Sequence, residues 1–316
     1  MAVINKLVSI VTPCYNGEHY IGRFLESIRK QSYKNIELVI INDGSTDRTE
    51  GVVENYRNQL EDREIHLIYY RFQKNEGQAV ALNAGLKFVK GEYLLWMDSD
   101  DTISDDFIEE RVMYLEKNQE KAFCYGKAVC VLEDEPEKII SVIEKRKKSG
   151  RYDFFEDIIN VNDVFFPGYM CRVSALDTVL HNREIYAGAG GQNAQLLLPL
   201  AWHFGEPGYV EKSEYKYYLR ANSHSHSQDS SEKKIEQLNR YEKIVISTLE
   251  NIDDINMKKY IAVARKKYAR MRFGNAVDTR NPDLIRKYYK EIAALKIANF
   301  HDLLMLIKYT FFSAER

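Results

Sequence analysis

Three aspartates lie within four residues of one another, directly after a short apolar run. The run is Leu94–Met97, and Asp98, Asp100 and Asp101 follow it, with Ser99 between the first two acids. Carboxylates this close repel one another unless a cation lies among them. Hard divalent cations take oxygen ligands and often share them with substrate phosphates. If the apolar run is a strand of a parallel sheet, the spacing predicts a metal site.

Two further polar segments also follow apolar runs in the first half of the chain. They are Thr12–Glu18 and Asn42–Asp47. Taken alone, the second reads as a turn and a helix start, with Ser45 or Thr46 as the N-cap. The carboxyl ends of parallel strands meet at one edge of a sheet, where ligands bind. Together with the aspartates, the two segments therefore predict one site.

The apolar pattern of the first hundred residues alternates between short runs and helical spacing. We expect strands at 7–12, 36–41, 66–72 and 93–97, and helices at 21–28, around 52–56, and at 78–89. Repeated strand-helix units predict an α/β fold with a parallel sheet and helices on both faces.

The apolar pattern after residue 101 predicts a segment that contains both strands and helices, followed by a segment that contains helices alone. We expect helices at 105–118, 190–204, 235–249, 257–273, from 282 and at 300–312, strands at 122–132 and 165–173, and a loop at 221–234. We therefore place a domain at 1–230, divided into halves 1–101 and 102–230, and a C-terminal helical extension at 231–316.

Composition and charge narrow the class of protein. With 316 residues, 45% of them hydrophobic, the chain can bury a sizeable core, which excludes a disordered or collagenous protein. The net charge of -2 conceals a basic tail, since 18 basic and 11 acidic residues lie in 231–316. Nothing in the pattern supports nucleic-acid binding. The tail could dock on an anionic membrane, or pack on domain 1–230 or on a second copy of the chain as a homodimer.

The cysteines and the apolar segments indicate the compartment. The four cysteines form no Cys-x-x-Cys pair, so we expect reduced, structural thiols. Residues 1–6 lack the features of a signal peptide. The longest apolar run near the C-terminus, 303–312, is interrupted by Lys308 and is shorter than the ~20 residues that cross a bilayer. We therefore expect a cytoplasmic protein, at most peripheral at the inner face of the membrane.

Four segments carry a resemblance to a known family. Val8–Gly17, Ile41–Asp47, Asn75–Gly77 with Leu82–Gly85, and Asp98–Asp101 resemble, in order and spacing, the nucleotide-sugar half of glycosyltransferase family 2. The resemblance implies the GT-A fold, a mostly parallel Rossmann-like sheet flanked by helices. It also implies inverting transfer from a nucleoside-diphosphate sugar, with Mn or Mg as cofactor.

The resemblance also implies roles for individual residues. Those expected to bind the nucleotide-sugar donor are Thr12, Pro13, Tyr15, Glu18, Asp43, Asn75, Gly77, Asn83, Asp98, Ser99 and Arg220. Asp43 would bind the base, usually uracil, and for Asn83 a bond to a neighbouring loop is an equal alternative. The metal ligands would be Asp100, Asp98 and His224, although His224 could equally be an exposed loop residue. The expected catalytic residues are Asp101, Gln192 and Asn193.

The acceptor half departs from the family pattern. Where relatives usually carry a Glu-Asp pair as general base, this chain has amides at Gln192 and Asn193, which cannot accept the proton near neutral pH. The segment resembles a Gly-Gly-Gln-Asn variant of capsule and surface-polysaccharide transferases. We read it as a variant acceptor site, in which the amides orient the acceptor. Glu184 or Asp163 would then be candidate bases.

Two functions from different classes remain open at this stage. The first is a metal-dependent, inverting glycosyltransferase that moves a hexose, with UDP as the expected nucleotide, to a hydroxyl of a surface polysaccharide or lipid-linked glycan. The second is a non-catalytic nucleotide-sugar-binding or assembly subunit of a polysaccharide synthesis complex, which the missing carboxylate motivates. A dinucleotide oxidoreductase is excluded, because no Gly-x-Gly-x-x-Gly follows the first strand.

Overall fold

The computed structural model describes residues 5–146, 153–161, 167–188, 191–220 and 230–311. The chain divides into two compact units, Met1–Arg220 and Ala221–Arg316. The sequence pattern placed this division near residue 230, and the contacts place it at Arg220. The two units are described separately below.

A parallel half-sheet forms the start of the first unit. Its strands are β1 (Val8–Cys14), β2 (Ile36–Asn42), β3 (His66–Arg71) and β4 (Tyr93–Trp96), in the order β3-β2-β1-β4. All three pairings between them are parallel. The connecting helices are α1 (Ile21–Arg29), α2 (Thr49–Glu61) and α3 (Gln78–Leu86). This confirms the strand-helix units that the apolar pattern predicts.

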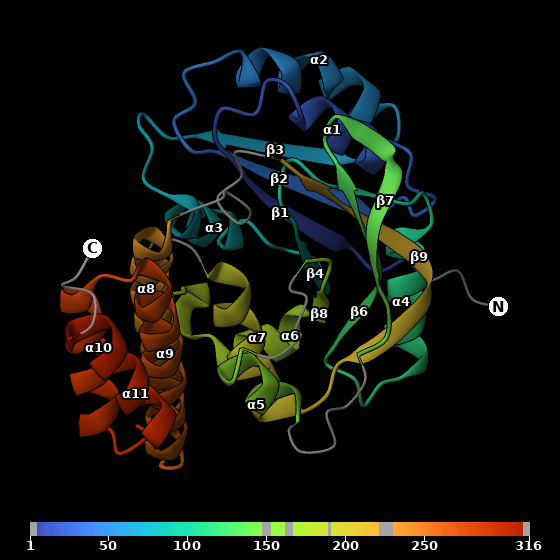
Figure 1. The fold of residues 1–316 in the computed structure, drawn as a ribbon. Coiled ribbons are helices and arrows are strands. Elements are labelled where there is room, and N and C mark those ends of the chain that lie inside the picture. Colours follow the sequence, from blue (N-terminus) through green and yellow to red (C-terminus); the bar gives the residue numbers. More distant parts are fainter. Residues whose placement is uncertain (1–4, 147–152, 162–166, 189–190, 221–229, 312–316) are drawn as a thin grey trace. The chain divides into compact units, whose positions relative to one another are not determined.

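Helices cover both faces of this half-sheet. α1 and α2 lie on one face and α3 on the other (Figure 1). The α1 face is sealed by apolar side chains such as Ile10, Phe24 and Leu38. On the opposite face α3 approaches closely at Gly85, where a Cβ atom would lie 2.4 Å from Val11. This close approach holds α3 against β1. The first turn of α3, which begins at Gln78, then lies beside the carboxyl ends of the strands.

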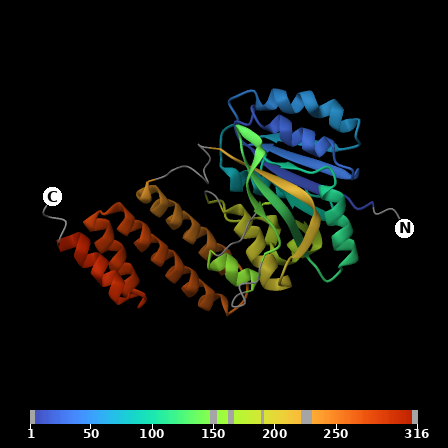
Figure 2. The ribbon, with the colours of Figure 1, turned by 45° about the vertical axis from the view of Figure 1, so that its right-hand side comes forward.

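Mixed strands extend the sheet beyond β4. β8 (Met170–Arg172) pairs antiparallel with β4, followed by β6 (Phe123–Leu132), β9 (Gly208–Leu219) and β5 (Thr102–Ile103). β6 and β9 are parallel, whereas β5 is antiparallel to β9. β7 (Glu135–Ile143) pairs with β6 as a hairpin, drawn in green in Figure 2. The sequence pattern did not predict β5, β7 or β9.

Four α-helices and one 3-10 turn complete the described part of the first unit. They are α4 (Phe107–Lys117), α5 (Phe154–Ile159), α6 (Val173–Val179), the 3-10 turn His181–Arg183 and α7 (Gln192–Phe204). α7 packs against α3, α5 and α6, so its N-terminus lies on the α3 side of the sheet. Gly191 precedes α7 in the left-handed region, with φ of 69°, a conformation that glycine adopts without strain.

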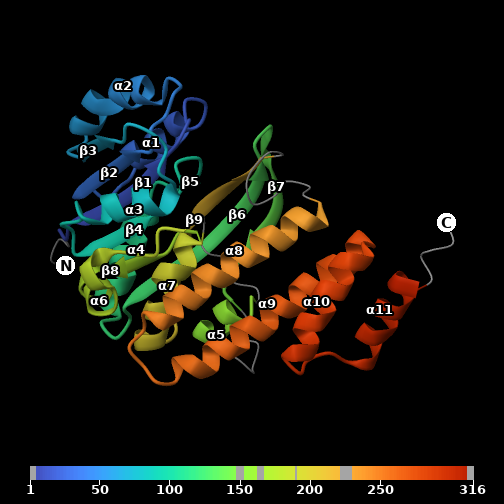
Figure 3. The same cartoon turned by 90° about the vertical axis from the view of Figure 1, so that its left-hand side faces the viewer.

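The second unit consists of four helices in the part that the structure describes. They are α8 (Ser231–Glu250), α9 (Met257–Thr279), α10 (Pro282–Ala294) and α11 (Phe300–Phe311), seen side by side in Figure 3. Ile235, Phe273 and Ile292 contribute to their common core. Residues 231–234 are helical, so their assignment to a loop was wrong. The Ser230 side chain caps the helix there by accepting the N–H of Lys233.

Within the described ranges, no helix is long and apolar enough to cross a membrane.

Candidate active site

The carboxyl ends of β1, β2 and β4 lie together at one edge of the sheet. The register pairs Cys14 with Asn42 and Val11 with Trp96, so the polar residues that follow these strands are brought together. One oxygen from each of Asp98, Asp100 and Asp101 lies within 4.8 Å of the others. The acidic cluster predicted from the spacing is therefore present at the expected edge.

Asp98 and Asp101 lie in different surroundings. Asp98 Oδ1 accepts a hydrogen bond of 2.9 Å from Gln78 Nε2 on α3. Asp101 is fully buried and accepts the Tyr215 hydroxyl at 2.7 Å and the Tyr218 N–H at 3.1 Å. Burial, and then the charge of the neighbouring Asp100, raise the pKa of both carboxyls.

Asp100 is paired with an arginine from the end of β9. The Arg220 guanidinium donates to Asp100 Oδ2 and lies over the Tyr20 ring, 4.6 Å from its centroid. The Arg220 Nε is buried and has no hydrogen-bond partner among the described residues. Arg220, which is predicted to bind a phosphate, therefore pairs with Asp100, which is predicted to bind the metal.

The donor atoms fit a hard divalent cation. The hydrogen bonds described above engage one oxygen of Asp98 and one of Asp100. Both oxygens of Asp101 are engaged by protein donors, which suits a supporting role. Oxygen donors in this number suit Mg²⁺ or Mn²⁺ when a substrate phosphate adds further ligands. His224, the third predicted ligand, lies outside the described residues.

Asp43 and the turn before α3 form a second part of the site. Asp43 accepts the N–H groups of Glu76 at 2.7 Å and Gly77 at 2.9 Å. Burial raises the pKa of Asp43 despite these two bonds. Gly77 has φ of 98°, and Asn75 beside it is exposed. The acid expected to bind the base therefore also fixes the Asn75–Gly77 turn.

Glu18 connects the first two polar segments. Its carboxylate accepts the Arg48 N–H at 2.9 Å, a bond that lowers the pKa of Glu18. Its own N–H donates to Asp47 Oδ2 at 3.0 Å. These contacts fasten the loop after β1 to the loop after β2.

The other donor residues predicted from β1 and β4 lie close by. Thr12 is buried and its Oγ1 has no partner among the described residues, while Tyr15 is 45% exposed. Ser99 is also buried.

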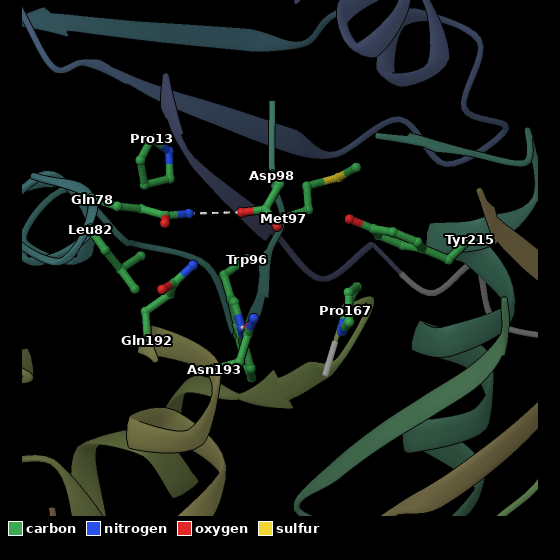
Figure 4. A pocket seen from close by; sticks show the side chains of 10 residues that line it. All are labelled: Pro13, Gln78, Leu82, Trp96, Met97, Asp98, Pro167, Gln192, Asn193 and Tyr215. Atoms are coloured by element: carbon green, nitrogen blue, oxygen red, sulfur yellow. Dashed lines mark hydrogen bonds between the residues drawn. The ribbon is translucent and has the colours of Figure 1, made fainter. Parts of the chain in front are cut away.

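A pocket lies between the ends of β1 and β4, α3 and the first turn of α7 (Figure 4). Its lining residues come from β1, α3, β4, α7 and β9 and the segments beside them: Pro13, Gln78, Leu82, Trp96, Met97, Asp98, Pro167, Gln192, Asn193 and Tyr215. Gln192 and Asn193 enter from the first turn of α7, below Asp98 in Figure 4. The Trp96 indole N–H donates to Asn193 Oδ1 at 2.6 Å. The two predicted amides therefore lie in one pocket with Asp98, a member of the acidic cluster.

Two amide side chains hold the backbone of Ile185 and Tyr186, which precede α7 in the chain. Asn83 donates to the Ile185 carbonyl and accepts the Ile185 N–H, both at 2.8 Å. Gln195 makes the same pair of bonds to Tyr186, at 2.7 and 3.1 Å. Asn83 therefore makes the bond to a neighbouring loop that was one of its two alternatives, and its contact with the donor stays a prediction.

The candidate bases lie outside this pocket lining or outside the described residues. Glu184 is paired with Lys87 at 3.0 Å and is about half exposed. Asp163 lies outside the described residues. Asp98 is the carboxylate among the residues that line the pocket.

Sequence reasoning missed three residues that hold the acidic cluster. Gln78 directly follows the Asn75–Gly77 turn, so its position was a usable indication. Tyr215 and Arg23 gave no local indication, because they lie 114 and 77 residues from their partners Asp101 and Asp100.

Sequence comparison identifies relatives for the first unit. Residues 9–180 match the model of glycosyl transferase family 2. An uncharacterised glycosyltransferase of Haemophilus influenzae is 34% identical over 139 residues, covering 44% of this chain and 54% of that protein. One of Rickettsia typhi, RT0329, is 39% identical over 117 residues, covering 37% and 34%. The matches thus span about a third to a half of these relatives.

Solved structures show the same fold over nearly the whole chain. TarS residues 1–349 of Staphylococcus aureus, in complex with UDP-GlcNAc, align with a TM-score of 0.64 at 16% identity, covering 98% of this chain and 93% of that one. The mannosyltransferase PcManGT of Pyrobaculum calidifontis, with GDP-Man and Mn²⁺, aligns with a TM-score of 0.54 at 16% identity, covering 99% and 82%. Since the family model covers more than half of the chain, the protein belongs to glycosyltransferase family 2 and has the GT-A fold.

Proposed function

We propose that this glycosyltransferase moves a hexose from a UDP-linked donor, with a divalent cation and with inversion, to a hydroxyl of a surface polysaccharide or a lipid-linked glycan. The observation that carries the proposal is the acidic cluster at the end of β4, of which Asp98 lines a pocket together with the first turn of α7. A donor bound at the cluster would present its sugar toward that turn.

The donor side is supported by residues that suit each part of a nucleotide sugar. Asp43 accepts the Glu76 and Gly77 N–H groups, one on each oxygen, and a remaining lone pair of its carboxylate would accept a base N–H. Arg220 has the forked geometry that suits a pyrophosphate. The structural neighbours carry UDP-GlcNAc in one case and GDP-Man with Mn²⁺ in the other. The family resemblance favours uracil as the base.

Asp98 and Asp100 would hold Mn²⁺ or Mg²⁺, with Asp101 supporting them from the interior. When bound, the cation neutralises charge on the leaving pyrophosphate. Arg220 adds a second positive charge once it leaves Asp100 for a phosphate oxygen, and its unpartnered Nε then gains an acceptor.

The transfer itself exchanges one carbon–oxygen bond for another. The acceptor oxygen attacks the anomeric carbon from the face opposite the leaving phosphate, and its bond forms as the bond to the phosphate breaks. Gln192 and Asn193 would orient the acceptor by hydrogen bonds, with Asn193 held by Trp96. The acceptor proton passes to a base other than these amides, because an amide does not accept a proton near neutral pH.

The second unit would bring the enzyme to its acceptor. α11 exposes Phe300 at 74%, Leu303 at 38% and Leu304 at 43%. This apolar face, in a unit rich in basic residues, suits peripheral contact with an anionic membrane on its cytoplasmic side, or a homodimer. Sedimentation with anionic vesicles, and the molecular mass in solution, distinguish the two.

The test is a binding and turnover panel on the full chain. Calorimetry with UDP, GDP, CDP and dTDP, with and without Mn²⁺, should give metal-dependent binding of UDP that Asp100→Ala abolishes. Acceptor-dependent release of UDP should follow with the matching sugar donor. Metal-independent binding, or binding unchanged in Asp100→Ala, would refute the metal role. Binding without turnover on any acceptor would favour the non-catalytic subunit that the amides at Gln192 and Asn193 motivate.

A further inference from the structure

A second arginine contacts Asp100, at its backbone carbonyl, whereas Arg220 contacts its carboxylate. Arg23 on α1 donates to the Asp100 carbonyl oxygen through Nε at 2.9 Å and through Nη2 at 2.6 Å. The bond is to the backbone, so it leaves the Asp100 carboxylate available as a ligand. Arg23 thereby fixes the peptide unit from which that carboxylate projects.

Arg23 is itself held by two neighbours. Glu133, in the turn between β6 and β7, pairs with both terminal nitrogens of the guanidinium, at 2.8 Å for Nη2. The Tyr218 ring lies under the guanidinium, 3.8 Å from its carbon. The Glu133 N–H in turn donates to the Leu219 carbonyl at 3.0 Å. The guanidinium is therefore fixed in position and orientation.

The same residues also reach Asp101. The Tyr218 ring contacts Arg23, and the Tyr218 N–H donates to Asp101 Oδ1 at 3.1 Å. Arg23 thus acts on the acidic cluster twice, through the Asp100 carbonyl and through the strand that holds Asp101. The negative charge of Glu133 offsets the positive charge of Arg23, so the arginine adds little electrostatic repulsion to a metal ion bound at the cluster.

We propose that Arg23 is a positioning residue for the divalent cation, and that Glu133 holds Arg23 in place for this purpose. The inference rests on the proposed function, because it requires that Asp98 and Asp100 bind the cation. Arg23 makes no contact with substrate in this scheme and acts through the Asp100 peptide unit. Loss of its two charge-assisted bonds would let the loop shift and weaken metal-dependent UDP binding.

The test measures UDP affinity by calorimetry at saturating Mn²⁺, and Mn²⁺ affinity by electron paramagnetic resonance. Arg23→Gln should weaken both by about ten- to hundredfold, the range for hydrogen bonds to charged groups. Arg23→Lys should recover only part, because an ammonium cannot bridge the carbonyl and both Glu133 oxygens. The matched control is Arg29→Gln, which removes an arginine of the same helix that pairs with Glu26.

Glu133→Gln keeps the proposal testable if Arg23→Gln folds poorly. It should weaken Mn²⁺ binding in the same direction, and the double variant should be no weaker than Arg23→Gln alone. Full recovery in Arg23→Lys, or wild-type affinity in the double variant, would show that charge alone matters and would overturn the positioning role. A fall in melting temperature with unchanged affinities would also overturn it, since that is what a purely structural contact predicts.

The outcome also separates this inference from the proposed function. If wild-type protein binds UDP with Mn²⁺ and Asp100→Ala does not, unchanged binding in Arg23→Gln refutes the inference alone. If wild-type protein shows no metal-dependent binding, both the inference and the proposed metal role are refuted.

Discussion

Replacement of Gly44 by alanine should disturb both stability and donor binding. Gly44 follows Asp43 and has φ of 68°, in the left-handed region. A Cβ atom there would lie 2.2 Å from the Lys74 carbonyl carbon and 2.6 Å from the Asn75 nitrogen. Both are backbone atoms, so no change of rotamer relieves the overlap. The backbone at Lys74 and Asn75 must move away from Asp43.

The cost has two parts. An L-residue in the left-handed region costs roughly 1–2 kcal/mol. Forcing a methyl group into a packed position costs roughly 1–3 kcal/mol more. A total of about 3 kcal/mol corresponds to a fall in melting temperature of roughly 6–12 °C for a unit of this size. The displaced turn also carries the two N–H groups that bind Asp43, so UDP affinity should fall about tenfold, as for the loss of one such bond.

The assay is thermal unfolding of Gly44→Ala and Gly51→Ala, followed by calorimetry with UDP and Mn²⁺. Gly51 lies in α2, and a Cβ atom added there would have nothing within 4 Å, so alanine should raise stability slightly at this position. UDP binding of Gly51→Ala should match wild type. If Gly44→Ala melts within about 1 °C of wild type and binds UDP equally well, the reasoning from close backbone approach is refuted.

Three further predictions concern charge, ion pairing and thiols. Burial and the charge of Asp100 raise the pKa of Asp98 to about 7, so Mn²⁺ binding should release protons and should strengthen from about pH 6 to about pH 8. Calorimetric titrations with Mn²⁺ in buffers of different ionisation enthalpy would measure the proton release. Without metal, stability should fall as the pH rises through that raised pKa, since the folded chain then holds more protons than the unfolded chain. Arg272→Met should destabilise the second unit by about 3 kcal/mol, the lower end of the range for breaking a buried ion pair, because it leaves the partly exposed Glu242 and Glu291 without their buried partner. Urea unfolding followed by far-UV circular dichroism measures this loss, and an effect no larger than that of the exposed Arg286→Met would contradict it. All four cysteines are buried and unpaired, so Ellman's reagent should detect no thiol in the native protein and four after denaturation; a native thiol that reacts within seconds would contradict the burial.

The parallel half of the sheet could be predicted because its evidence is local. β1, β2 and β4 are short apolar runs, each buried on both faces. Strands of that kind are recognisable without knowledge of their neighbours. The polar residues after them fall at the same edge whatever follows in the chain.

The strands that sequence reasoning missed lack such local evidence. β7 is exposed along nearly its whole length, and β5 has only two residues. β9 carries charged and aromatic side chains at intermediate exposure, and its pairing partner β6 lies about eighty residues earlier. These segments form strands because of the neighbouring strands with which they pair. The hydrophobic periodicity of the segments themselves does not reveal those neighbours.

The same distinction holds for the candidate site. The amino-acid sequence by itself determined the acidic cluster after β4, the segments around Asp43 and Gly77, and the absence of a carboxylate at Gln192 and Asn193. Only the tertiary structure decided that Arg220 pairs with Asp100, that Tyr215 holds Asp101 and that Arg23 holds the Asp100 carbonyl. These partners lie far apart along the chain, and only the packing of β9 and α1 beside the end of β4 brings them within hydrogen-bond distance.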